Sequence, residues 1–79
     1  MAENVNRLNN VAQEMGFIDM LRYGDPERQG PAHNETWHIR VYINNLQYGY
    51  GEGHSQKVAK DRAAQQALRV LAERNFVIN

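Results

Sequence analysis

The chain has 79 residues, of which 42% are hydrophobic, and its nine basic and nine acidic side chains cancel to a formal net charge of zero. This length fits one small domain, alone or cut from a longer protein, and the zero charge does not mark a nucleic-acid binder. The lack of cysteine, of a secretion signal and of an apolar run of membrane length argues against a disulfide scaffold and a membrane protein, and favours an intracellular location in cytoplasm or nucleus.

The charges are unevenly distributed along the chain. Residues 1–53 carry four arginines against seven carboxylates, a formal charge of −3, whereas residues 54–79 carry five basic against two acidic side chains, a charge of +3. A local concentration of positive charge in the last third favours a local anion site over a broad basic surface.

The first predicted element is an amphipathic helix over residues 4–15. Gly16 stands where a C-terminal cap is expected, with Phe17 folding back as its apolar contact. The opposite face carries Asn6 and Asn10, whose amides both donate and accept hydrogen bonds and so could read hydroxyls and base edges. A polar face without a ligand is the competing interpretation. The apolar stripe follows the i, i+3, i+7 spacing of a helix and consists of Val5, Leu8, Val11, Ala12 and Met15.

The segment from residue 18 to residue 33 is less regular. Residues 18–23 could form a strand, but Asp25-Pro26 interrupts the pattern, and a proline in a strand indicates an edge or an end. Gly30-Pro31-Ala32-His33 has the composition of a tight loop.

Two further strands are predicted on either side of Asn44-Asn45, which can adopt the positive φ angles of a type I′ hairpin turn. Apolar and polar residues alternate over residues 36–43. Counting outward from the turn pairs Ile43 with Leu46, Val41 with Tyr48 and Ile39 with Tyr50, and predicts that Tyr48 and Tyr50 share the apolar face. On the polar face, His38 is expected to be solvated.

A long helix is predicted from residue 56 to about residue 73, with Ser55 as its N-cap and glycines 49, 51 and 53 leading into it. Small residues form a narrow seam that allows close approach to a neighbour: Ala59, Ala63, Ala67 and Val70, flanked by Ala64 and Leu71. The predicted fold is therefore α+β, an α-β-β-β-α two-layer sandwich with both helices on one face of a three-stranded antiparallel sheet. The domain is expected to span residues 4–74, followed by a tail over residues 75–79 whose apolar residues could cover a core edge.

Lys57 and Lys60 lie one turn apart in the first turns of this helix. Cations at a helix N-terminus are unfavourable by a few tenths of a kcal/mol each, because the helix dipole is already positive there. A bound anion would relieve this repulsion and use the free amides as well, and phosphate is the obvious candidate. The alternative is a solvated helix start with scattered lysines.

Three motifs in order, over residues 4–72, resemble the double-stranded RNA-binding domain family. The family's Gly-Pro-x-His loop appears as residues 30–33. Its glycine-rich strand exit followed by Ser-Lys-Lys-x-Ala-Lys appears as residues 51–60, and its Ala-Ala-x-x-Ala-Leu continuation as residues 63–68. Three departures stand out: Gln56 replaces the family's first lysine, Asn10 stands where glutamate is common, and Pro26 breaks the first strand.

The resemblance implies binding of double-stranded RNA by its A-form shape, largely without sequence preference, across two minor grooves and the major-groove phosphates between them. It implies no catalytic residue, cofactor or metal. The implied contacts are Asn6 and Asn10 in one minor groove, Gly30, Pro31 and His33 in the next, and Gln56, Lys57 and Lys60 on the phosphates.

Two other functions compete with this one. Some members of the family pair with proteins, so a homodimer or partner-protein module with weak or no RNA binding is the main alternative. A metal site or enzyme is disfavoured because three histidines without cysteine, and no nucleophile–base pair, give no metal-ligand or catalytic pattern. Nucleases such as ribonuclease III carry domains of this family, so a catalytic domain elsewhere in a parent protein is compatible with the sequence.

Overall fold

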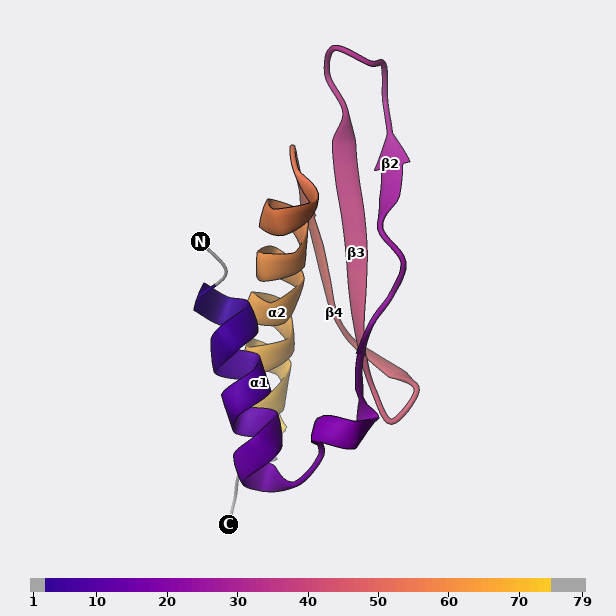
Figure 1. The fold of residues 1–79 in the computed structure, drawn as a ribbon. Coiled ribbons are helices and arrows are strands. Elements are labelled where there is room, and N and C mark those ends of the chain that lie inside the picture. Colours follow the sequence, from indigo (N-terminus) through magenta and orange to yellow (C-terminus); the bar gives the residue numbers. More distant parts are fainter. Residues whose placement is uncertain (1–2, 75–79) are drawn as a thin grey trace.

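The structure, a computed structural model, describes residues 3–74 and consists of a layer of two helices against an antiparallel sheet (Figure 1). The predicted α+β class and α-β-β-β-α order are confirmed, with the first strand in two pieces. In chain order the elements are α1 (Glu3–Met15), the short 3-10 helix η1 (Ile18–Met20), β1 (Leu21–Tyr23), β2 (Glu27–Gln29), β3 (Thr36–Ile43), β4 (Leu46–Gly53) and α2 (Gln56–Glu73). The predicted tail over residues 75–79 lies outside the described residues.

The ends of α1 follow from local sequence. Gly16 adopts a φ of +83° and the amide of Phe17 donates to the carbonyl of Ala12 at 2.8 Å, which closes the helix with the expected glycine cap. Phe17 is buried, as are Val5, Leu8 and Ala12 on the apolar stripe, whereas Met15 is exposed. Burial of this stripe against α2, in the common hydrophobic core, explains why α1 forms.

Strand β3 is the centre of the sheet. The two short strands β1 and β2 pair with different ends of β3 on one side, and β4 pairs with β3 along its other side. The amide of Gly24 still donates to the carbonyl of Arg40, but Asp25 and Pro26 leave the ladder, as the proline predicted. β1 and β2 are thus one interrupted edge strand.

The hairpin turn is as predicted, but the strand register beyond it is not. Asn44 and Asn45 have φ angles of 54° and 65°, and Ile43 pairs with Leu46. The register then shifts by one residue, so that Val41 pairs with Gly49 rather than Tyr48. This bulge moves Tyr50 to the open face of the sheet, opposite Arg40, and the prediction that it lies on the apolar face is wrong.

The physical reason for the shift is the close approach of α2. A Cβ on Gly49 or Gly51 would overlap backbone atoms of α2, at Ala63 for Gly49 and at Ala59 and Ala63 for Gly51. Glycines at alternate positions of β4 therefore face the alanine seam of α2, and the seam alanines Ala59, Ala63 and Ala67 are completely buried. The sheet and α2 meet almost backbone to backbone, which fixes where the helix starts.

Candidate nucleic-acid interface

The start of α2 is built as the sequence predicted. Ser55 is extended, and its Oγ accepts from the amide of Val58 at 3.1 Å. Gln56 and Lys57 are exposed and Lys60 is half-buried. Within residues 3–74, neither lysine is in an ion pair with a carboxylate. The first turn therefore presents uncompensated positive charge beside the free amides of a helix N-terminus.

Lys60 is held by an aromatic ring that sequence reasoning missed. Its Nζ lies 4.6 Å from the centroid of the Tyr23 ring. A groove of about 460 Å³ opens beside this pair, lined also by Lys57 and Gln56 from α2 and by Asp25 and Pro26 from the strand interruption. Burial, together with the negative charge of Asp61, raises the pKa of Tyr23 to about 12. The Tyr23 hydroxyl is buried and, within the described chain, has no hydrogen-bond partner.

The predicted loop over residues 30–33 is tight and exposed. Gly30 has a φ of +95°, and a side chain there would be strained and crowded against the carbonyl of Asn34. The amide of Asn34 donates to the carbonyl of Pro31 at 2.9 Å, and His33 is exposed. The Gly-Pro-x-His segment therefore holds its histidine out toward solvent.

A contact between two short segments connects this loop to the start of α2. His54 Nδ1 lies 3.2 Å from the carbonyl oxygen of Glu35, so it donates to that carbonyl. Glu35 also pairs with Arg28 of β2 at 3.5 Å. His54, which directly precedes the N-cap, thus connects the end of the β2–β3 loop to the start of the helix that carries the lysines.

Asp61 of α2 positions α1 in a similar way. Its two carboxylate oxygens accept from the backbone amide and the side-chain amide of Asn4, at 2.8 and 3.0 Å. Partial desolvation acts to raise the pKa of Asp61, but the hydrogen bonds from Asn4 and from the amide of Val5 outweigh it and hold the pKa below its ordinary value. Asn6 and Asn10 are both exposed. The amide face of α1 is therefore anchored at the same helix that carries the lysines.

Figure 1 shows how these segments lie relative to one another. The β2–β3 loop lies at the top of the view, α2 begins below it, and α1 begins about midway down the view and runs beside α2. The segments that carry the eight predicted binding residues are thus joined by the Asp61 and His54 contacts into one assembly. Sequence reasoning missed the three residues whose contacts hold these segments in place, namely Tyr23, His54 and Asp61. The clearest sequence signal for them is the placement of His54 and Asp61 on either side of the lysines.

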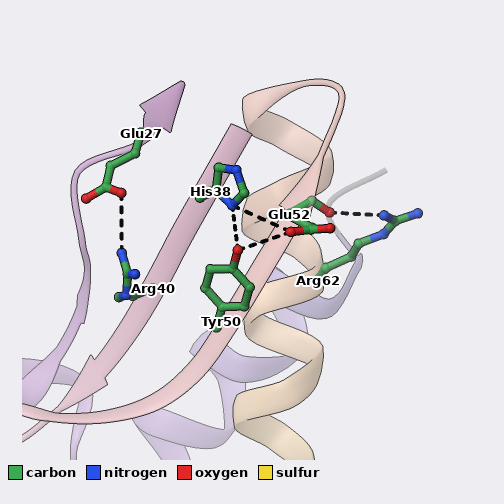
Figure 2. Close-up of polar contacts among 6 residues, drawn as sticks. All are labelled: Glu27, His38, Arg40, Tyr50, Glu52 and Arg62. Carbon is green, nitrogen blue, oxygen red and sulfur yellow. Dashed lines mark hydrogen bonds and ion pairs between the residues drawn. The ribbon is translucent and has the colours of Figure 1, made fainter. Parts of the chain in front are cut away.

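On the open face of the sheet, in contrast to the start of α2, the polar side chains contact one another (Figure 2). His38 Nδ1 lies 2.5 Å from the hydroxyl of Tyr50, which donates in turn to Glu52 at 3.1 Å, and the His38 side chain is only 12% exposed. The prediction that His38 is solvated is therefore wrong, because the register shift brings Tyr50 beside it. Partial desolvation and the hydrogen bond to Glu52 raise the pKa of Tyr50. Arg40 pairs with Glu27 at 3.6 Å and covers the Tyr50 ring.

Residues 3–74 contain neither a candidate metal centre nor a helix suited to span a membrane. No group of three or more histidine, cysteine or acidic side chains converges there in a way that could hold a metal ion. None of the helices in the same part of the chain has the length and apolar character needed to cross a bilayer.

Comparison with known proteins places the chain among RNA-binding modules. A family model described as "Double-stranded RNA binding motif" matches residues 5–71. The chain is 41% identical over 66 residues to Ribonuclease 3 of Geobacillus sp. (strain WCH70), covering 84% of this chain and 26% of the relative. It is 32% identical over 71 residues to Ribonuclease 3 of Enterococcus faecalis, covering 90% of this chain and 30% of the relative. The chain thus spans less than a third of the length of these relatives.

Proposed function

The chain belongs to the family of double-stranded RNA-binding domains and binds double-stranded RNA, and we propose that it does so along the surface formed by α1, the β2–β3 loop and the start of α2. The observation that carries this proposal is the pair Lys57 and Lys60, which no carboxylate within residues 3–74 neutralises. Duplex phosphates are the partners that such cations, at a capped helix start, are suited to hold.

Each segment has its own task in this proposal. Asn6 and Asn10 read 2′-hydroxyls in one minor groove, because amides can both donate and accept. His33 enters the next minor groove together with backbone groups of Gly30 and Pro31. Gln56, Lys57 and Lys60 contact phosphates across the major groove between them, so recognition depends on shape and hydroxyls and not on base sequence.

The replacement of a family lysine by Gln56 leaves two cations on the phosphates. Each phosphate neutralised contributes about −0.9 to the slope of log K against log salt on the B-DNA scale. We therefore expect these two lysines to contribute a slope of about −2, a modest salt dependence for a nucleic-acid binder.

The test is a gel-shift comparison of RNA, RNA–DNA hybrid and DNA duplexes of equal length and sequence at two salt concentrations. The RNA duplex should bind most tightly and the DNA duplex least, with the same order at both salt concentrations, because hydroxyls are read along with phosphates. Equal binding of the three duplexes would show that simple electrostatics governs the interaction.

We further propose that the domain serves a longer protein whose catalytic part lies elsewhere, since relatives named Ribonuclease 3 are three to four times longer than the matched region. The domain itself is a binding module. In such a protein it would deliver the duplex to the catalytic part. An intracellular location remains a prediction, as do the domain bounds 4–74.

Pairing with a second copy or another protein also remains a prediction, and two contacts of β4 with α2 disfavour pairing by addition of a strand at β4. Gln66 Oε1 accepts from the outward amide of Tyr50 at 2.6 Å, and Arg62 Nη1 donates to the carbonyl of Glu52 at 3.0 Å. Side chains of α2 therefore occupy backbone groups that another strand would need. Light scattering beside the RNA titration separates pairing from RNA binding.

A further inference from the structure

The interrupted edge strand places an aromatic ring beneath a phosphate-binding lysine. Tyr23 is the last residue of β1 and pairs with Val41, whose side chain belongs to the core. The chain then leaves the ladder at Asp25, and the groove beside α2 opens at that point. The ring of Tyr23 is left against the first turns of α2, with the Lys60 ammonium 4.6 Å from its centroid.

A ring holds a lysine in a way that a carboxylate cannot. A lysine side chain is long and flexible, and fixing it on a ring face removes part of the freedom it would otherwise lose on binding a ligand. An ion pair would fix it too, but would cancel its charge. Asp25 lines the same groove without forming an ion pair with Lys60, and Asp61 is occupied by the amides of Asn4 and Val5. Lys60 is therefore oriented and still charged.

We propose that Tyr23 is a positioning residue for RNA binding, whose ring holds the Lys60 ammonium at the mouth of the groove in the orientation that meets a phosphate. This inference rests on the proposed function, since it assigns Lys60 to a phosphate. The hydroxyl of Tyr23 has no hydrogen-bond partner within the described chain and takes no part in the task. The ring alone should therefore be sufficient.

The experiment compares the affinity of one RNA duplex for three variants and the wild-type chain. Tyr23→Phe keeps the ring and should bind within about twofold of wild type, whereas Tyr23→Leu should bind about three- to fivefold more weakly. The matched control is Tyr42→Leu on the open sheet face, where Arg22 covers a tyrosine ring in the same manner at 5.6 Å. It should leave affinity within about twofold, because that ring serves no phosphate contact in the proposal.

A double-mutant cycle shows whether the ring acts through the lysine. Once Lys60→Ala has removed the ammonium, adding Tyr23→Leu should cost nothing more in affinity. If the two losses multiply, or if Tyr23→Phe is as weak as Tyr23→Leu, the inference is overturned. If Lys60→Ala itself leaves affinity unchanged, the proposed phosphate contact fails instead, so the two failures are distinguishable.

A second measurement does not need the leucine variant to fold. The ε-methylene protons of Lys60 should show an upfield ring-current shift in NMR spectra of the free wild-type chain and of Tyr23→Phe. Shifts at ordinary lysine values in both proteins would overturn the inference, whatever the stability of Tyr23→Leu.

Discussion

Two regions of this small domain carry positive side chains, and they use them differently. On the open sheet face, Arg40 forms an ion pair with Glu27 at 3.6 Å. At the start of α2, Lys57 and Lys60 have no carboxylate partner within residues 3–74, and Lys60 rests on a neutral ring. Arg40 of the sheet face is committed to an ion pair within the domain, whereas Lys57 and Lys60 at the start of α2 remain available to a ligand.

This difference explains how a chain of zero net charge can hold a polyanion. Net charge counts every side chain equally, but a paired cation contributes little potential at a distance, and an unpaired one contributes its whole charge. Hydrogen bonds connect Asp61 to α1 and His54 to the β2–β3 loop. They hold beside the unpaired lysines the groups that we propose contact the two neighbouring minor grooves of an RNA duplex.

The largest expected effect is a loss of stability when α2, which carries the lysines, is forced away from strand β4 of the sheet. Gly51→Ala places a methyl group against backbone atoms of Ala59 and Ala63, so α2 must move away from β4. Overpacking of this kind, against backbone that cannot rotate away, should lower the free energy of unfolding by about 3 kcal/mol or more. Urea unfolding measures this change.

The control for this variant is Gly24→Ala. An added methyl group there would meet mainly the side chain of Tyr42, which can shift. A smaller loss than for Gly51→Ala is expected, and equal losses would mean that close helix–sheet approach is not what the glycines of β4 provide.

The next effect separates the two sets of cations directly. Lys57→Ala with Lys60→Ala should weaken binding of duplex RNA tenfold or more, about 1.4 kcal/mol, while the circular dichroism spectrum stays native. Arg22→Ala with Arg40→Ala removes the same charge from the open sheet face. Isothermal titration calorimetry should find this second pair within about threefold of wild type, and similar losses for both pairs would mean that only total charge matters.

Asp61 provides a test of how α1 is attached beside the lysines. Asp61→Ala should lower the free energy of unfolding by about 1 kcal/mol, the usual cost of losing a helix cap. Because the folded pKa lies below the unfolded value of 3.8, this stabilisation is complete above about pH 4 and is lost as the pH falls through the folded pKa. Thermal unfolding of both proteins at pH 7 and pH 3 should therefore show a smaller difference in acid.

A carboxylate of the sheet face serves as the matched case. Glu27→Ala removes an exposed ion-pair partner of Arg40 and should change stability by less than about 0.5 kcal/mol. If Glu27→Ala lowered the free energy of unfolding as much as Asp61→Ala does, the hydrogen bonds from Asn4 would stabilise the fold no more than an exposed ion pair.

The smallest effect concerns the amides of α1. Asn6→Ala with Asn10→Ala should weaken RNA binding by about threefold and reduce the preference for RNA over DNA, because these side chains are proposed to read hydroxyls. Competition binding with the two duplexes measures both quantities. A loss that is equal for RNA and DNA would assign these amides to general contact and not to hydroxyl recognition.

Local chemistry predicted much of this molecule. The Ser55 cap, the Gly16 cap and the Asn44-Asn45 turn each depend on a few neighbouring residues, and the structure has all three as predicted. The register of β4 failed because counting outward from a turn assumes a regular ladder. The repeated glycines of β4 and the alanine seam of α2 together carried the missing information, since each requires the other.

In the candidate site too, features set by neighbouring residues were predicted and features set by packing were not. Lys57 and Lys60 were identified by their place in one helix turn, which is a local property. The contact of Asn4 with Asp61 spans 57 positions of the chain, and that of Tyr23 with Lys60 joins a strand to a helix. Such contacts follow only from the packed fold, so a single sequence can propose the binding groups but not what holds them in place.

The most direct test of the difference between the two regions is an NMR titration of the isotope-labelled chain with an RNA duplex. We predict that the largest amide shift changes fall on the exposed face of α1, on residues 30–33 and on residues 56–60, with little change at residues 38, 40 and 50. Largest changes on the open sheet face, with residues 56–60 unaffected, would contradict the account.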